Sequence, residues 1–73
     1  MFQFNPFEQI LTSPDLGNYR SYGIRAFAEG GEEVCFVSDV SCDFAFVAAL
    51  ADECTLLQLD PSQLLDVVID ALN

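Results

Sequence analysis

The chain contains no lysine and no histidine, and its only cationic side chains are Arg20 and Arg25. These absences exclude much of the chemistry that enzymes use. A histidine base, a serine or cysteine nucleophile activated by histidine, a Schiff-base lysine and a phosphate-loop lysine all need residues that are missing. A zinc site with a histidine ligand is excluded in the same way. We therefore expect no enzymatic activity and no cofactor.

The three cysteines have a spacing that indicates neither a disulfide framework nor a metal site. Cys35, Cys42 and Cys54 form no CxxC pair, and an odd number leaves at least one thiol unpaired. Cys42 is the only candidate for a reactive thiol, because it stands in the first turn of a predicted helix. Asp39 and Asp43 flank it, and nearby negative charge disfavours a thiolate. We expect reduced thiols that serve as small packing groups.

Long apolar runs are also missing. The longest is the eight-residue run from Phe44 to Ala51, whereas a helix that spans a bilayer needs roughly 20 apolar residues. The first residues, Met1 to Glu8, include no basic side chain, so we expect no secretory signal. A cytoplasmic location without membrane association is the resulting prediction.

The composition indicates a folded but strongly acidic protein. Twelve carboxylates give a net charge of -10, yet 52% of the residues are hydrophobic, which is too many for a disordered acidic tail. With 73 residues, the chain forms one domain, residues 1–73, around a single small core. Phosphate binding relies on lysine and arginine, so we expect no direct binding of nucleic acid.

Alternating side chains predict strands in the first half of the chain. Between Tyr19 and Ala28, alternate residues place Tyr22, Ile24 and Ala26 on one face. A second strand is predicted from Val34 to Val40. The turn Glu29–Glu32 joins the two, and we expect both of its glycines to supply positive φ angles.

The first 18 residues are ambiguous. The spacing of Phe7, Ile10 and Leu11 fits one helical turn, whereas the turn-forming residues Thr12–Gly17 that follow fit a first strand that enters a turn. A strand is slightly favoured, and an arm exchanged between subunits is the third alternative.

Helical periodicity begins after Val40. Ser41 is the expected N-cap, with Asp43 in the first turn. The residues that share one arc of this helix are Phe44, Val47, Leu50, Ala51 and Cys54. We expect the helix to end between Cys54 and Leu57.

A second helix has a clearer start, with Asp60 as N-cap, Pro61 in the first position and Gln63 completing a capping box. Its apolar arc is about 200° wide, roughly twice what a helix needs to lie on one core. Such a helix needs two neighbours. These are either the first helix and the sheet, or a second subunit.

The predicted fold class is therefore α+β: a short antiparallel β-meander of two or three strands, followed by two α-helices packed on one face. The predicted elements carry the motifs Tyr22-Gly23-Ile24, Asp39-Val40-Ser41, Leu59-Asp60-Pro61 with Leu64, Val67-Val68 and Asp70-Ala71-Leu72. Through these motifs, residues 19–73 resemble a family of small Firmicutes proteins that is classed as a domain of unknown function. The resemblance implies a strand-rich first half, a two-helix second half and no assigned activity.

The many carboxylates permit two further roles. The Asp-x-Asp-x-Asp-Gly spacing of an EF-hand is missing, so a divalent metal could be held only weakly, by Glu29, Glu32 and Glu33. The dense negative charge also suits an acidic inhibitor, or a mimic of nucleic acid, that binds a basic protein. Arg20 and Arg25 are expected on opposite faces of their strand, with Arg25 paired to Glu33 across the hairpin.

The leading functional hypothesis is a non-enzymatic protein–protein interaction module, either a homodimer or the acidic partner of another cytoplasmic protein. It is based on the wide apolar arc of the second helix, the apolar N-terminal segment and an unprotected sheet edge, on a chain too small to cover them well. The residues expected at the interface are Leu65, Val68, Ile69, Leu72, Phe2 and Phe7.

Overall fold

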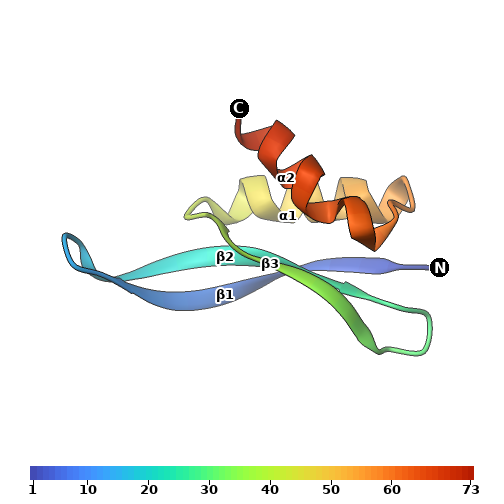
Figure 1. The fold of residues 1–73 in the computed structure, drawn as a ribbon, viewed down its shortest axis with the longest axis horizontal. Coiled ribbons are helices and arrows are strands. Elements are labelled where there is room, and N and C mark those ends of the chain that lie inside the picture. The colour runs from blue at the N-terminus through green and yellow to red at the C-terminus, as the bar shows by residue number, and fades with distance from the viewer.

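The computed structural model describes all 73 residues and consists of a three-stranded antiparallel sheet with two helices on one of its faces (Figure 1). The strands are consecutive neighbours in the order β1-β2-β3. The elements are β1 (Gln3–Ser13), β2 (Gly17–Phe27), β3 (Glu33–Ser41), α1 (Phe44–Leu56), the 3₁₀ turn η1 (Pro61–Gln63) and α2 (Leu64–Leu72). The α+β meander predicted from the sequence is confirmed.

The first 18 residues form a full strand and a turn. β1 pairs with β2 without interruption from Gln3 opposite Phe27 to Ser13 opposite Gly17. The turn closes at Gly17, whose φ of 68° lies in the left-handed region that glycine adopts without strain. The favoured strand is therefore correct, and the helical alternative for Phe7–Leu11 is wrong.

The second hairpin is less regular. Between the pairs Tyr22–Ser41 and Ile24–Val37 the register shifts, so that β3 carries extra residues opposite Gly23. A Cβ atom on Gly23 would lie within 3.0 Å of the Phe7 ring and of a carbonyl oxygen on β3, so only glycine fits there. In the predicted turn Glu29–Glu32, Gly31 alone has a positive φ, of 88°. One glycine, rather than the expected two, is sufficient for this loop.

One hydrophobic core lies between the sheet and the helices. α1 packs over β1 and β2, and α2 packs over β3. The ten buried residues are Phe4, Ile24, Ala26, Val40, Val47, Leu50, Ala51, Cys54, Leu64 and Val68. The predicted face of β2 is correct, since Ile24 and Ala26 are fully buried and Tyr22 packs against them. Full burial of a side chain such as Ile24 contributes about 1.5–3 kcal/mol.

The start of α1 differs from the prediction by two residues. β3 extends through Ser41, so the N-cap is Asp43, whose Oδ1 accepts a hydrogen bond from the backbone N–H of Phe46 at 3.2 Å. Ser41 acts one step earlier, where its Oγ accepts from the N–H of Asp43 at 3.0 Å. The register shift in β3, with Asp39 at a φ of 54°, lengthens the strand and moves the cap.

The end of α1 and the start of α2 lie close to their predicted positions. α1 ends at Leu56, and Gln58 takes the left-handed conformation with a φ of 49°. The N–H groups of Gln58 and Leu59 donate to the carbonyls of Thr55 and Cys54, at 3.1 and 3.0 Å, in the pattern of a Schellman motif.

After this motif, Asp60 caps η1 by accepting from the N–H of Ser62 at 3.0 Å. This bond lowers the pKa of Asp60 because it favours the carboxylate. Gln63 makes no capping bond, so of the predicted capping box only the Asp60 side chain acts as a cap.

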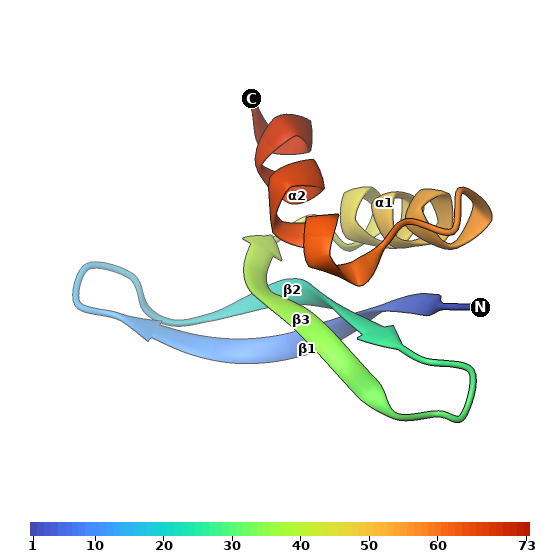
Figure 2. The same ribbon diagram turned by 45° about the vertical axis from the view of Figure 1, so that its right-hand side comes forward.

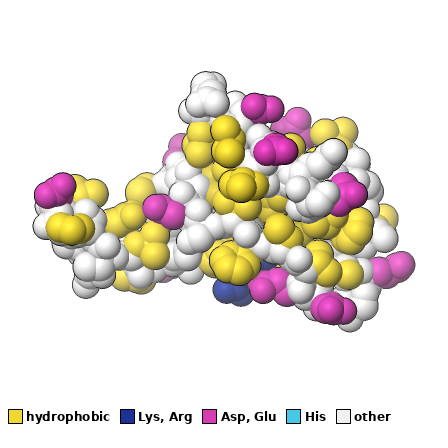
Figure 3. Space-filling model, viewed as in Figure 1, with side chains coloured by type: hydrophobic (Ala, Val, Ile, Leu, Met, Phe, Trp, Pro, Cys, Tyr) yellow, Lys and Arg dark blue, Asp and Glu magenta, His cyan; other side chains and the backbone are white.

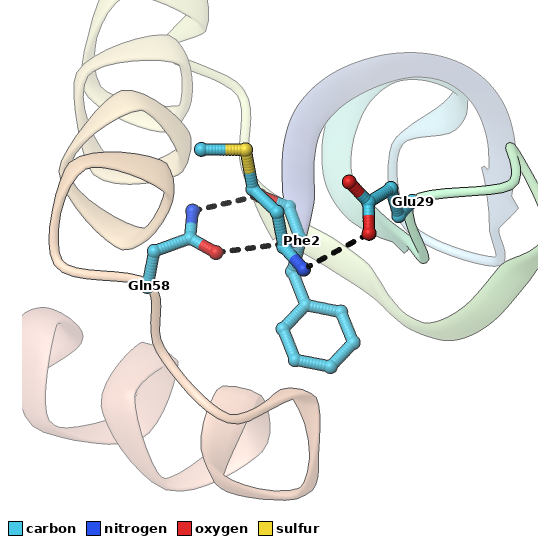
Figure 4. A network of polar contacts seen from close by, with 4 residues as sticks. Phe2, Glu29 and Gln58 are labelled. Atoms are coloured by element: carbon cyan, nitrogen blue, oxygen red, sulfur yellow. Dashed lines mark hydrogen bonds and ion pairs between the residues drawn. The ribbon is translucent and has the colours of Figure 1, made fainter.

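Two side chains at the end of α1 bind the backbone of β1. Thr55 Oγ1 accepts from the N–H of Phe4 at 2.9 Å and also lies 3.3 Å from its carbonyl oxygen. The side-chain amide of Gln58 faces the backbone of Phe2 (Figure 4), accepting from its N–H at 2.8 Å and donating to its carbonyl at 2.9 Å. Backbone N–H groups point to alternate sides along a strand, so residue 6 is the next one after Phe2 and Phe4 to face this edge. That residue is Pro6, which has no N–H. The start of the β1 edge is thus protected from pairing with another chain.

Replacing Thr55 with valine tests this contact. Thr55→Val keeps the shape of the side chain but leaves the N–H of Phe4 without an acceptor, so the free energy of unfolding should fall by about 1–2 kcal/mol. The control is Thr12→Val, since the Thr12 hydroxyl only bonds to the exposed Asn18 side chain. Urea unfolding followed by circular dichroism gives both values. Equal effects of the two substitutions would contradict the assignment.

Candidate functional site

The second helix has an uncovered apolar side. Leu64 and Val68 are buried in the core, whereas Leu65, Ile69 and Leu72 remain 55%, 48% and 52% exposed. At about 100° per residue, these three fall within one arc of about 60°. We call Leu65, Ile69 and Leu72 the outer flank of α2.

The structure brings together only half of the residues expected at an interface. Val68 lies in the core, at 3% exposure. Phe2 is half-buried against the core, beside the end of α1, and Phe7 is half-buried on the opposite face of the sheet. The outer flank is therefore the single contiguous part of the predicted set.

The outer flank stands on the same side of the molecule as the last strand of the sheet. α2 contacts β3, whose outer edge has no strand partner. Figures 1 and 2 both show α2 above β3, with its C-terminal end directed away from the sheet. Figure 3 shows hydrophobic side chains gathered over α2 on this face. The last turn of α2 thus projects beyond any element that could cover it.

A groove lies on the other side of α2, between this helix and α1. Its volume is about 300 Å³, and its apolar lining consists of Leu50, Cys54, Leu57, Leu59, Val67 and Ala71. The two remaining lining residues are Glu53 on α1 and Asp70 on α2. Leu57 is 71% exposed at one end. We call these eight residues the interhelical groove.

The groove contains one thiol, that of Cys54. Burial raises the pKa of Cys54, and the negative charge of Glu53 raises it further, so the thiol stays protonated at neutral pH. All three cysteines are free, with Cys42 exposed and Cys35 half-buried. The packing role expected for Cys54 agrees with its place in the core.

The uncovered face of the sheet carries an aromatic cluster that was not predicted from the sequence. Phe7 and Phe36 meet edge-to-face with ring centroids 6.4 Å apart, and the Arg25 guanidinium lies 4.2 Å from the Phe7 centroid. Strand alternation alone could not place Phe7 and Arg25 on one face, because that placement also requires the pairing of β1 with β2. Phe36 is 58% exposed, so this cluster is small and open to solvent.

The same face holds a polar network around Asp39. Its carboxylate accepts from the Ser21 hydroxyl at 2.6 Å and from the Tyr19 hydroxyl at 3.2 Å, and its backbone N–H donates to Gln9 at 2.8 Å. Partial desolvation raises the pKa of Tyr19, and the contact with the Asp39 carboxylate adds to this. These bonds satisfy the buried Ser21 and fix the shifted register of β3. No cation or strong base lies within the network.

Both arginines are engaged by glutamates within the sheet. Arg20 Nε lies 3.3 Å from Glu8, and Arg25 Nε lies 3.3 Å from Glu33, so the predicted cross-strand pair is confirmed. The regular register of β1 with β2 places the two arginines on opposite faces, as expected.

The acidic turn between β2 and β3 makes only exposed contacts. The carboxylate of Glu29 lies 4.0 Å from the chain's amino group (Figure 4), and Glu33 is paired with Arg25. No three carboxylate or thiol side chains gather closely enough to hold a metal ion.

Comparisons with known proteins give no further lead. No family model, curated protein or solved structure matches the chain. The resemblance of residues 19–73 to a family of Firmicutes proteins therefore stays a prediction. Neither helix has the length and apolar character needed to cross a bilayer.

The excess negative charge predicts a response to salt. Because the net charge is -10 and both arginines are already paired, the other carboxylates repel one another across the small surface. Raising NaCl from about 20 to about 200 mM shortens the screening length several-fold and should stabilise the fold. We expect the melting temperature to rise by about 4 °C, or roughly 1 kcal/mol of stability.

Calorimetry with a charge-reduced control, Asp52→Asn with Asp66→Asn, isolates the cause. The control should gain less from salt than the parent chain. A melting temperature that falls over this range would refute the interpretation.

Proposed function

We propose that this chain is a non-enzymatic protein–protein interaction module that forms a homodimer through the outer flank of α2 and the adjoining edge of β3. The observation that carries the proposal is the half-exposed flank formed by Leu65, Ile69 and Leu72. Large aliphatic residues at positions i, i+4 and i+7 are the spacing by which one helix packs on another. On a chain with only ten core residues, this is a large apolar surface to leave in water.

Electrostatics supports a second copy as the occupant of this flank. The arc of the outer flank contains no carboxylate, because Asp66 and Asp70 lie about 90° and about 130° from its centre on the helix. Two copies that each carry a net charge of -10 can therefore meet there without burying like charges. A two-fold axis would place the same patch on both subunits, which is the commonest arrangement of soluble dimers. We expect such a module to act in the cytoplasm, without direct binding of nucleic acid.

A second function, that of an acidic partner or inhibitor of a basic protein, is favoured by a separate observation. Both cations are neutralised within the sheet, so a partner would meet a surface whose unpaired charge is negative. This role is compatible with a dimer, since it uses carboxylates and not the outer flank.

Substitution of Ile69, in the middle of the outer flank, tests the homodimer. Because Ile69 is already half-buried, Ile69→Glu removes about 1 kcal/mol of apolar burial from each subunit, or about 2 kcal/mol per dimer and about 30-fold in the dissociation constant, and it adds the cost of burying a charge. Sedimentation velocity at about 20 µM should show a dimer for the parent chain and a monomer for Ile69→Glu.

The matched control is Leu56→Glu, because Leu56 is 84% exposed on α1 and outside the flank. This variant should stay dimeric, and circular dichroism should show that both variants are folded. A monomeric parent chain, or equal dissociation of the two variants, would disprove the proposed interface.

A further inference from the structure

The interhelical groove differs from the outer flank in the kind of partner that it can accept. Its floor is apolar, but its two polar groups are both carboxylates, Glu53 and Asp70. At about 300 Å³ it stands at the lower limit of small-molecule pockets, and it suits an inserted apolar side chain better than a cofactor. Leu57, which is 71% exposed, opens the apolar lining to solvent at one end.

We infer that the interhelical groove binds an amphipathic basic helix of another protein, with one large apolar side chain in the groove and lysine or arginine side chains beside Glu53 and Asp70. Helix-in-groove recognition uses apolar residues at i, i+3, i+4 and i+7 as anchors. Leu57, exposed at the end of the groove, provides contact for a second anchor, one turn along the partner helix.

Charge selects this occupant among the alternatives. The only cationic side chains, Arg20 and Arg25, lie on β2 and are paired with Glu8 and Glu33, so neither is available to Glu53 or Asp70. A second copy would bring further carboxylates to the groove and no lysine. Anionic lipid headgroups would be repelled by the same two carboxylates. A cationic helix gains from both the local pair and the overall charge of -10, which also raises its rate of association.

The inference goes beyond self-association because the two surfaces lie on different sides of α2. The helix contributes Val67, Asp70 and Ala71 to the groove, and their arc is centred roughly 150° or more from that of the outer flank. A homodimer formed through the flank would therefore leave both grooves open. The assembly would hold two basic partners on a dimeric acidic core.

The test uses designed peptides and the full chain labelled with ¹⁵N. The probe is a leucine–lysine amphipathic peptide of about 18 residues, or five helical turns. One control peptide replaces every lysine with glutamate, and a second scrambles the leucine–lysine order so that no apolar face forms. The probe should bind with a dissociation constant of about 10 µM and shift the amide signals of Leu57, Val67 and Ala71. Neither control should shift these signals.

Two pairs of variants distinguish peptide binding at the groove from attraction by the overall negative charge. Ala71→Phe fills the groove and should weaken probe binding about 10-fold, whereas Ala45→Phe, on the exposed side of α1, should have no effect. Glu53→Gln with Asp70→Asn should weaken binding about 10-fold and reduce its salt dependence. Asp15→Asn with Glu32→Gln removes the same charge from two distant turns, and should change binding less than about two-fold.

Three outcomes would overturn the inference: failure of the probe to bind, an equal loss in the two charge variants, or unchanged binding by Ala71→Phe. Sedimentation of the same variants separates this result from the homodimer. None of them alters the outer flank, so each should sediment as the parent chain does. A parent chain that binds the peptide but sediments as a monomer would count against the homodimer alone.

Discussion

The contact between the end of α1 and the start of β1 determines which surfaces of this small protein remain uncovered. Thr55 and Gln58 bind the backbone of Phe4 and Phe2, residues more than 50 positions away in the chain. This contact holds α1 over β1 and β2, and the short connection through η1 then leaves α2 above β3. α2 inserts Leu64 and Val68 into the core, and its last turn projects away from the sheet. The β1 edge of the sheet is protected at its start, and the opposite side of the molecule, at β3, carries the outer flank.

In the proposed function, charge divides the uncovered surfaces between different partners. Two arginines cannot balance twelve carboxylates, and both are already bound within the sheet. A surface that meets another copy of the chain must therefore lack carboxylates, as the outer flank does. A surface with carboxylates at an apolar groove is complementary to a cationic partner, which this chain cannot itself provide. In our proposal, the scarcity of cations thus gives the two sides of α2 different specificities.

Much of the architecture could be predicted from local patterns. Alternation at Tyr22, Ile24 and Ala26 and the turn before Glu33 located the second hairpin, and Asp60-Pro61 located the start of the last helical segment. These signals act between neighbours in the chain, so they need no knowledge of the fold. By contrast, Phe7, Ile10 and Leu11 fit both a helix and a strand, and only their pairing with β2 decides between them.

The candidate site was harder to predict for the same reason. An apolar arc of about 200° on the last helix could not be divided into core, groove and outer flank without the position of α1. Val68 was expected at an interface and lies in the core, whereas Val67 and Ala71 were not among the expected interface residues and line the groove. The cap at Asp43 was missed because the register shift in β3, a tertiary feature, extends that strand to Ser41.

The central claim is that two copies meet at the outer flank, and intermolecular nuclear Overhauser effects test it most directly. In a sample that mixes ¹³C-labelled and unlabelled chains, effects that cross between subunits can be selected. The account predicts such effects among the methyl groups of Leu65, Ile69 and Leu72. Intermolecular effects confined to Phe7 and Phe36, on the uncovered face of the sheet, would contradict it. So would their absence from a sample that sediments as a dimer.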